Sequence, residues 1–325
     1  MAQLFESYDD VDDISQGLKA DDPGERRIAV IELGHSGDPK AIVHLGGMTA
    51  DPDAGVRQQV ALALGEFDGL PVAAALATLL VDVETAVAGA AADSLAELKD
   101  PACAEAILPL VGHRDAFVRA RALRALKELR RKDALKPALD ALRDADEGVR
   151  AQAVGVIGFL KLEEAVPALM AATGDDGAVV RKAAVSALAF SSARSAVGAI
   201  VGALADPDWM VRETAAETLG MNGGAEQAVA PLIEAVADDV WQVRLKAVRS
   251  LGRMKAVAAV EAIGRCLDHS QVNLRKESAA ALGEIADAAG LPFLEAVFDD
   301  PDPEVRKNAR WAGQQIVLKR QREGR

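Results

Sequence analysis

The sequence predicts an all-α fold, an α-solenoid of about ten two-helix repeats that are each 31 residues long. A Val-Arg pair returns along the chain at that fixed spacing. Half of the residues are apolar while only 3% are aromatic, so alanine, leucine and valine form the core, which suits closely packed helices. The length of 325 residues exceeds what one globular core usually serves, whereas a stack of repeats can be of any length.

The arginine of the Val-Arg pair defines the repeat. Successive arginines are 31 residues apart, except for one step of 32 between Arg212 and Arg244, and Ala88 stands in the arginine position of the third repeat. Leu274 replaces the valine in the ninth repeat, and Arg26 carries the register back to the first. The arginine column otherwise consists of Arg57, Arg119, Arg150, Arg181, Arg212, Arg244, Arg275 and Arg306.

Two further columns follow the arginine. The third residue on is small in almost every repeat, as at Ala29, Ala153 and Ser278, and the seventh is leucine or isoleucine except at Gly313. With the preceding valine, these positions are spaced by four and share one face of a helix. The small residue lets a neighbouring helix approach closely while the larger ones fill the space between layers.

A second apolar segment precedes each of these helices, for example residues 104–111, 135–142, 165–172 and 228–236. Acidic turns such as Asp51-Pro52-Asp53 and Asp206-Pro207-Asp208 separate the two segments. Aspartate there suits the N-cap of the helix that follows. Many repeats then have a glycine at or just past the helix end, which predicts left-handed C-caps at Gly34, Gly65, Gly220, Gly252 and Gly283.

The pattern D-P-D-x-x-V-R-x-x-A-x-x-x-L-G resembles HEAT repeats, specifically the short bacterial kind that also occurs in phycobilisome lyases. The resemblance covers roughly Asp13 to Gln315. It implies that the second helix of each repeat lines a concave face. It also implies that the aspartates and arginines form a ladder of hydrogen bonds between neighbours, which makes the arginine column structural. The alternative is that these evenly spaced arginines form an anion-binding track.

The two ends differ from the array. We expect an acidic leader over residues 1–12, the solenoid over 13–316 and a basic tail over 317–325 that frays. The leader carries Leu4, Phe5 and Tyr8 among its acidic residues, and it is either a disordered cap or a short docking segment.

Charge and hydropathy limit the partners. A net charge of -13 argues against binding to nucleic acid, because phosphates need an excess of lysine and arginine. A DNA-glycosylase activity is disfavoured for the same reason and by the few aromatic residues. No apolar stretch approaches the length of a membrane span, and the N-terminus lacks the basic charge of a signal peptide. We therefore expect a cytoplasmic protein without a membrane partner.

The sequence favours a non-enzyme without metal or cofactor. Each of the four histidines, His35, His44, His113 and His269, lacks a following glutamate, so the His-Glu metal pairs of HEAT-like deoxyhypusine hydroxylases are absent. His113 and His269 occupy equivalent turns five repeats apart and cannot share a metal. Cys103 and Cys266 fall in the fourth and ninth repeats, too far apart for a disulfide, and we expect free packing thiols.

The side chains that the core leaves over predict a site for a protein partner. On the second helices, the first, second and fifth residues after the arginine should be the least buried, and their charges alternate in patches. Trp209 and Trp241 each stand three residues before the arginine and are either binding anchors or packing for the helix start. The candidate partner-binding residues are Arg121, Arg124, Trp209, Glu213, Glu217, Trp241, Lys246, Arg249, Lys276 and Glu277.

Two functions follow from this reading. The first is a non-catalytic scaffold, adaptor or accessory subunit that holds another protein or an enzyme complex on the concave face. We expect the chain itself to be a monomer or an accessory subunit. The alternative, suggested by the type of repeat, is a protein similar to phycobilisome lyases that attaches or chaperones a tetrapyrrole chromophore or another cofactor.

Overall fold

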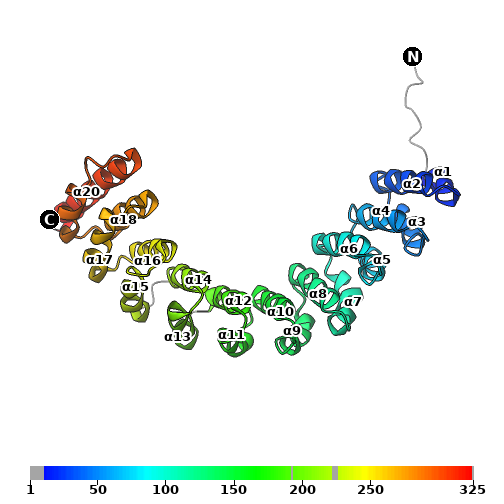
Figure 1. Cartoon of the computed structure of the whole chain (residues 1–325), viewed down its shortest axis with the longest axis horizontal. Helices are drawn as coiled ribbons and strands as arrows, with labels where there is room; N and C mark the ends of the chain where they lie inside the picture. The colour runs from blue at the N-terminus through cyan, green and yellow to red at the C-terminus, as the bar shows by residue number, and fades with distance from the viewer. Residues whose placement is uncertain (1–10, 192, 222–225, 324–325) are drawn as a thin grey trace, which may run out of the picture. The chain divides into compact units, whose positions relative to one another are not determined.

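The computed structural model describes residues 11–191, 193–221 and 226–323, and within these ranges the regular structure is entirely helical (Figure 1). The chain divides into two compact units, Met1–Leu160 and Lys161–Arg325, which we describe one at a time. Each unit is a stack of helix pairs, so the predicted α-solenoid is confirmed. None of the helices in these ranges is both long and apolar enough to cross a membrane.

Unit one contains five helix pairs. Its first helices, several of which are flanked by 3₁₀ turns, are α1 (Val11–Ile14), α3 (Ala41–Gly47), α5 (Leu70–Leu80), α7 (Ala104–Ile107) and α9 (Leu135–Ala141). The second helices are α2 (Pro23–His35), α4 (Ala54–Leu64), α6 (Thr85–Glu97), α8 (Ala116–Leu129) and α10 (Glu147–Leu160).

Unit two repeats the arrangement. Its first helices are α11 (Val166–Ala172), α13 (Arg194–Gly202), α15 (Val229–Ala235), α17 (Val260–Arg265) and α19 (Leu291–Glu295). Its second helices are α12 (Ala178–Ala187), α14 (Trp209–Leu219), α16 (Trp241–Arg253), α18 (Val272–Ile285) and α20 (Pro303–Glu323).

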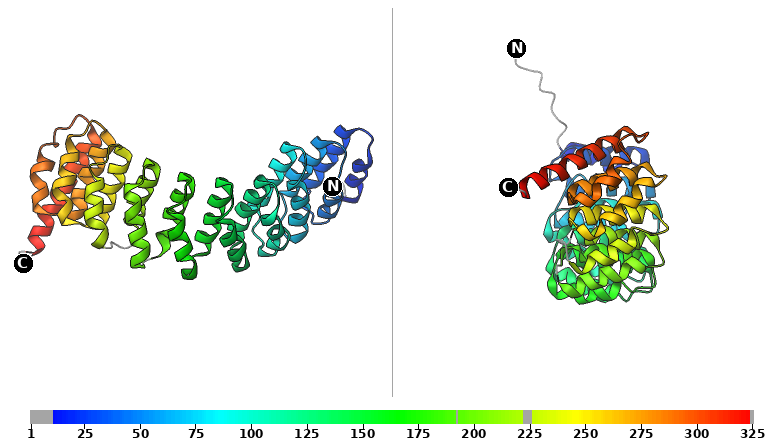
Figure 2. Two further views of the ribbon diagram at one scale, coloured as in Figure 1. Left: turned by 60° about the horizontal axis from the view of Figure 1, so that its bottom comes forward. Right: turned by 90° about the vertical axis from the view of Figure 1, so that its left-hand side faces the viewer.

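Within each unit the second helices form one row. In unit one α2, α4, α6, α8 and α10 pack in chain order, and in unit two α12, α14, α16, α18 and α20 do the same. Figure 2 shows the helices of each unit lying side by side, with the first helices forming a second row beside them. We call the side of unit two formed by α12, α14, α16, α18 and α20 the second-helix face.

The columns read from the sequence form the core between these rows. All ten residues of the small column are buried, from Ala29 to Ala309, and Ser278 is fully buried among them. The leucine column is buried as well, with Leu64, Ile157 and Leu219 having no exposed surface. The predicted core is therefore confirmed at these positions.

The acidic turns start the second helices as predicted. The carboxylate of Asp53 accepts a hydrogen bond from the backbone N–H of Val56, and that of Asp208 accepts from Met210 and Val211. Asp302 caps α20 by accepting from Glu304 and Val305. Each of these aspartates is the second acid of its D-P-D turn, and it satisfies N–H groups that have no partner within the helix.

The predicted left-handed C-caps are wrong. Gly65 and Gly220 have right-handed φ angles of -64° and -73°, and the left-handed residues at repeat ends are instead non-glycines such as Arg130 and Lys161. A Cβ atom on Gly220 would lie 2.2 Å from Ser250 Oγ, and one on Gly34 would lie 2.9 Å from Ala63 Cβ. These glycines are needed because the next second helix passes directly against them.

Serine completes two of these close approaches. Opposite Gly65, the Ser94 hydroxyl donates to the carbonyl of Ala61 at 2.9 Å, and opposite Gly220 the Ser250 hydroxyl donates to the carbonyl of Ala216 at 2.7 Å. Both bonds are buried, so the serine fills the groove beside the glycine and satisfies its own polar group there.

The structure describes the ends of the array only in part. Residues 317–323, which we expected to fray, continue α20 as far as Glu323, because Ile316 and the residues before it anchor the helix in the core. Val11 and Asp12 of the expected leader belong to α1, and Val11 is buried. Leu4, Phe5 and Tyr8 lie outside the described residues, as do residues 222–225 in the repeat with the step of 32.

Replacing Gly220 by alanine should destabilise the stack. The added methyl group would meet both the side chain and the backbone of Ser250, and overpacking of this kind typically costs about 1–3 kcal/mol. Gly198→Ala on α13 is the matched control, because nothing lies within 4 Å of its added Cβ. It should be neutral or stabilising by about 0.5–1 kcal/mol. Urea denaturation of both variants tests this, and equal stabilities would contradict the close approach.

Candidate functional site

Six arginines of the column bind an aspartate of the following repeat through two parallel hydrogen bonds. The arginine Nε lies 2.6–2.8 Å from one carboxylate oxygen, and Nη2 donates to the other oxygen. We call each such contact a rung. The rungs are Arg26–Asp51, Arg57–Asp82, Arg119–Asp144, Arg181–Asp206, Arg212–Asp238 and Arg275–Asp300.

Each rung also holds the acidic turns on either side of it. Arg181 Nη1 donates to the carbonyls of Asp175 and Asp176 in its own repeat, both at 3.0 Å. The Asp206 carboxylate accepts from Arg181 and also from the backbone N–H of Asp208 at 2.8 Å. The first aspartate of the D-P-D turn thus binds the preceding repeat, while the second caps its own helix.

The rungs are largely shielded from water. The side chains of Arg181 and Asp206 are 13% and 7% exposed. The hydrogen bond from Arg181 lowers the pKa of Asp206 below its ordinary value, against the desolvation that raises it. Desolvation is the larger effect at Asp238, yet the bonds from Arg212 and the backbone still hold its pKa low. These satisfied contacts support the structural interpretation of the column over the anion track.

The turn contacts of the rung arginines recur at other positions of the column. Arg150 and Arg306 donate through Nη1 to the carbonyls of their own turns, as the rung arginines do. Ala88, which has no charge to place, is followed 25 residues later by His113, where the rungs have aspartate. Arg244 is likewise followed by a histidine, His269, and its Nε donates to the carbonyl of Asp238.

The second-helix face of unit two contains a cavity of about 280 Å³. We call it the Trp241 cavity. It lies between α14, α16 and α18, and its lining includes five of the ten residues predicted to bind a partner. The lining residues are Glu213, Trp241, Gln242, Leu245, Arg249, Asn273, Lys276 and Glu277.

Charged side chains around this cavity pair with one another across repeats. Arg249 donates from Nε and Nη2 to the two carboxylate oxygens of Glu277 at 2.8 and 2.9 Å. The bond to Glu277 raises the pKa of Arg249 against the effect of burial. Lys246 Nζ donates to Glu217 at 2.8 Å. The charged side chains of neighbouring second helices are therefore already paired with one another.

The candidate residues are less exposed than we expected. Glu213, Lys246, Arg249 and Lys276 are all half-buried, because each second helix is flanked on both sides by another at close range. These side chains lie between neighbours. The expectation that such positions are the least buried is wrong for α14, α16 and α18, whereas Lys182 and Ser186 occupy the same positions of α12 and are exposed. The restricted motion of the half-buried side chains lowers the entropy that a binding partner would have to remove.

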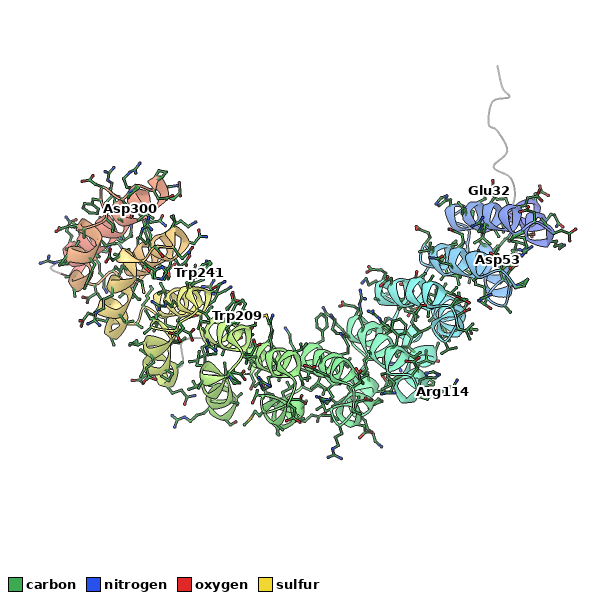
Figure 3. All side chains as sticks on the ribbon, in the orientation of Figure 1. Glu32, Asp53, Arg114, Trp209, Trp241 and Asp300 are labelled. Carbon is green, nitrogen blue, oxygen red and sulfur yellow. The ribbon has the colours of Figure 1, made fainter. Side chains whose placement is uncertain are left out.

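The two tryptophans differ in their surroundings. Each is the first residue of its helix, Trp209 in α14 and Trp241 in α16, and Figure 3 shows them on neighbouring second helices. Trp241 lines the cavity, whereas Trp209 does not and is 37% exposed. Trp311 on α20 packs over Gly283 and keeps 41% of its surface exposed.

The remaining candidates, Arg121 and Arg124, belong to unit one. Arg121 stacks over the ring of Phe117 with 5.0 Å to the ring centroid, and Arg124 lies 3.3 Å from Asp93. Phe159 accepts two further cations, Lys127 and Arg130, at 5.4 and 4.9 Å. We had not selected Phe117 or Phe159, although the scarcity of aromatic residues in the sequence could have drawn attention to both.

The cysteines and histidines do not gather into a catalytic cluster in the part of the chain that is described. Cys103 and Cys266 are both buried and free. Desolvation raises the pKa of the Cys103 thiol to about 11 and also raises that of Cys266, so neither is an activated nucleophile. No group of three potential metal ligands comes together within these residues.

The stacked helix pairs with their Arg–Asp rungs define an α-helical repeat protein. The family model described as HEAT repeats matches residues 11–96, 104–189, 178–244 and 229–312. The chain therefore belongs to the HEAT-repeat family. A second model, described as PBS lyase HEAT-like repeat, matches residues 87–113. No curated protein matches the chain in sequence.

Solved structures with a similar fold share little sequence with it. YibA of E. coli is 18% identical with a TM-score of 0.62, covering 82% of this chain and 97% of YibA. An engineered protein is 20% identical with a TM-score of 0.51, covering 94% and 98%. Kap95p bound to RanGDP is 15% identical with a TM-score of 0.59; the match covers 95% of this chain but 51% of Kap95p. At these low identities the similarity shows a shared fold and nothing about function.

Asp206→Asn should weaken the contact between the repeats that carry α12 and α14. It removes the charge that Arg181 binds, and hydrogen bonds to charged groups typically contribute about 1.5–3 kcal/mol. Asp208→Asn in the same turn is the control, because asparagine caps a helix about as well as aspartate. Hydrogen exchange of α12 and α14 together with the urea midpoint measures the difference. Equal losses in the two variants would contradict the role of the rung.

The contribution of this rung should disappear in acid. The pKa of Asp206 is lower in the folded chain than the ordinary value of about 3.9 expected when it is unfolded. Its contribution is therefore complete above that ordinary value and is lost as the pH falls through the lower, folded-state pKa. The stability difference between the wild type and Asp206→Asn should shrink steadily below about pH 4. A difference that stays constant down to about pH 2 would exclude this linkage.

Proposed function

We propose that the chain is a non-catalytic scaffold or accessory subunit that holds a protein partner on the second-helix face of unit two. The observation that carries the proposal is the Trp241 cavity, a hollow lined by one aromatic ring and bordered by ion pairs. Interfaces between proteins typically place a buried aromatic anchor at the centre and polar groups at the rim.

The size of the cavity suits one inserted side chain. About 280 Å³ is too little for a large cofactor but enough for a leucine, methionine or aromatic residue of a partner. Trp241 and Leu245 supply apolar walls and Asn273 supplies an amide for a hydrogen bond. Burying such an anchor against an indole ring removes apolar surface of both proteins from water.

The charges around the cavity favour a partner with both signs of charge. Glu213, Glu217 and Glu277 alternate with Lys246, Arg249 and Lys276 across α14, α16 and α18. A polymer with a single sign of charge would be repelled by the side chains of like charge on this face. A folded protein can place opposite charges against both signs and gain specificity from the match.

The fold is compatible with this role. Kap95p, which shares the fold, is bound to the protein RanGDP in its solved structure. The analogy is one of architecture, because the same fold carries many functions. The proposal for this chain therefore depends on the cavity and its charges.

One observation favours a second function. The match of residues 87–113 to the PBS lyase HEAT-like repeat suggests a protein that attaches or chaperones a tetrapyrrole. That function requires a pocket with aromatic residues and cations for the propionates. Phe117 and Phe159 with their stacked cations are the candidates for it in unit one.

Affinity purification from the native organism separates the two functions. The tagged full-length chain and its Trp241→Ala variant are purified in parallel, and the bound proteins are identified and quantified. A stoichiometric protein that is recovered by the wild type and lost by the variant supports the scaffold. A coloured preparation that contains a covalent or bound tetrapyrrole would overturn it.

Trp241→Ala should weaken binding of that partner by about 30-fold, which corresponds to about 2 kcal/mol for an interface anchor. Trp209→Ala, at the same position of the adjacent repeat, is the matched control and should change the affinity little, because Trp209 does not line the cavity. Calorimetric titration of the partner measures both. A larger effect of the Trp209 variant would place the contact elsewhere.

A charge swap distinguishes binding from folding at the same site. The double variant Arg249→Glu with Glu277→Arg keeps an ion pair across α16 and α18 but reverses its direction. The fold should be retained and the affinity for the partner should fall. Arg194→Glu, a charge reversal at the exposed start of α13, is the control and should leave the affinity unchanged.

A further inference from the structure

The rung at Arg244 lacks the aspartate that its position requires. In six other repeats the arginine finds a carboxylate 25 or 26 residues later. The residue 25 positions after Arg244 is His269. The imidazole replaces only one of the two contacts of the aspartate. Its Nδ1 accepts a hydrogen bond from the backbone N–H of Gln271 at 3.0 Å, as the rung aspartates accept one from their own turns, but it offers no carboxylate to the arginine. The charge of Arg244 is left without the carboxylate.

The guanidinium of Arg244 makes different hydrogen bonds from those of the rung arginines. In a complete rung Nη1 reaches the turn carbonyls while Nε and Nη2 bind the aspartate. At Arg244, Nε donates to the carbonyl of Asp238, and Asp238 itself is bound by Arg212. Within the described part of the chain, Nη1 and Nη2 of Arg244 have no hydrogen-bond partner. These two N–H groups form the fork that binds carboxylates elsewhere in proteins.

A cavity of about 470 Å³ opens beside this incomplete rung. Ile233, Val236 and Ala262 form its apolar wall, while Arg244, His269 and Arg265 bring donors to it. Arg265 is occupied by an ion pair with Glu261, and Asp268 adds one negative charge to the lining. Because Nδ1 of His269 accepts a hydrogen bond, the neutral ring carries its proton on Nε2, which is a further donor.

We infer that this cavity binds a carboxylate on a short aliphatic chain, which completes the rung at Arg244 in place of the missing aspartate. The fork of Arg244 holds the carboxylate, and Ile233, Val236 and Ala262 pack on the aliphatic part. The carboxylate belongs either to a small organic acid or to a glutamate side chain of a protein. The site shares no residue with the Trp241 cavity, so binding of a carboxylate here does not depend on binding of a partner there.

The other histidine of the column supplies an internal control. His113 stands in the same register and its Nδ1 accepts the N–H of Asp115 at 3.1 Å. There the arginine position is Ala88, so no guanidinium is available. A carboxylate has nothing to complete at that rung, and the inference applies to Arg244 alone.

Calorimetric titration and thermal melting of the full-length chain test the inference, with butyrate as the free acid and acetyl-Ala-Glu-Ala-amide as the glutamate side chain. Sodium chloride at equal ionic strength is the reference. The wild type should bind one of these probes and melt at a higher temperature with it than with chloride. Binding of butyrate assigns the site to a free acid, whereas binding of the peptide alone assigns it to a protein. Binding of neither overturns the inference.

Two variants locate the binding. Arg244→Gln should weaken it by about tenfold or more, as expected for loss of a charge-assisted bidentate contact. His269→Asp should also abolish it, because the new carboxylate lies in register to occupy the fork, and this variant should melt higher than the wild type without any probe. His113→Asp should leave probe binding unchanged. Undiminished binding to His269→Asp would overturn the inference even if Arg244→Gln fails to fold.

Discussion

The bidentate Arg–Asp rung between successive repeats is the contact on which the stack depends. One carboxylate, such as that of Asp206, binds the guanidinium of the preceding repeat and the backbone of its own turn. A half-buried guanidinium without such a partner would lose its hydration and gain little in return. In the D-P-D turns the first acid therefore forms the rung and the second caps the helix.

The close approach at the glycines sets the second constraint. Since a Cβ on Gly220 or Gly283 would collide with the next helix, the second helices lie as near to one another as their backbones allow. Residues on the second-helix face are consequently held between neighbours, and long side chains reach across to the adjacent repeat. The ion pair of Arg249 with Glu277 follows from this spacing, so the same packing that builds the core also orders the surface on which we place the partner.

The sequence predicted what depends on the period of the repeat. The small and leucine columns lie in the core and the second aspartate caps the helix, because these roles follow from spacing by four and from local backbone bonding. The sequence did not reveal why the glycines are required. A glycine that follows a leucine is equally consistent with a C-cap and with a close approach between two helices. The sequence also predicted Trp241, Arg249 and Lys276 as candidates. The cavity that they line depends on how three helices pack together, and the residue pattern within a single helix does not contain this information.

The two irregular rungs show why a missing residue must be considered with its partner. At Ala88 and His113 both the arginine and the aspartate of the rung are absent, so no guanidinium is left without its carboxylate. At Arg244 and His269 only the carboxylate is gone. The half-buried guanidinium of Arg244 keeps its charge beside a cavity whose wall includes Ile233, Val236 and Ala262. An external carboxylate at this fork would complete the one contact of the rung that the chain itself does not supply at Arg244.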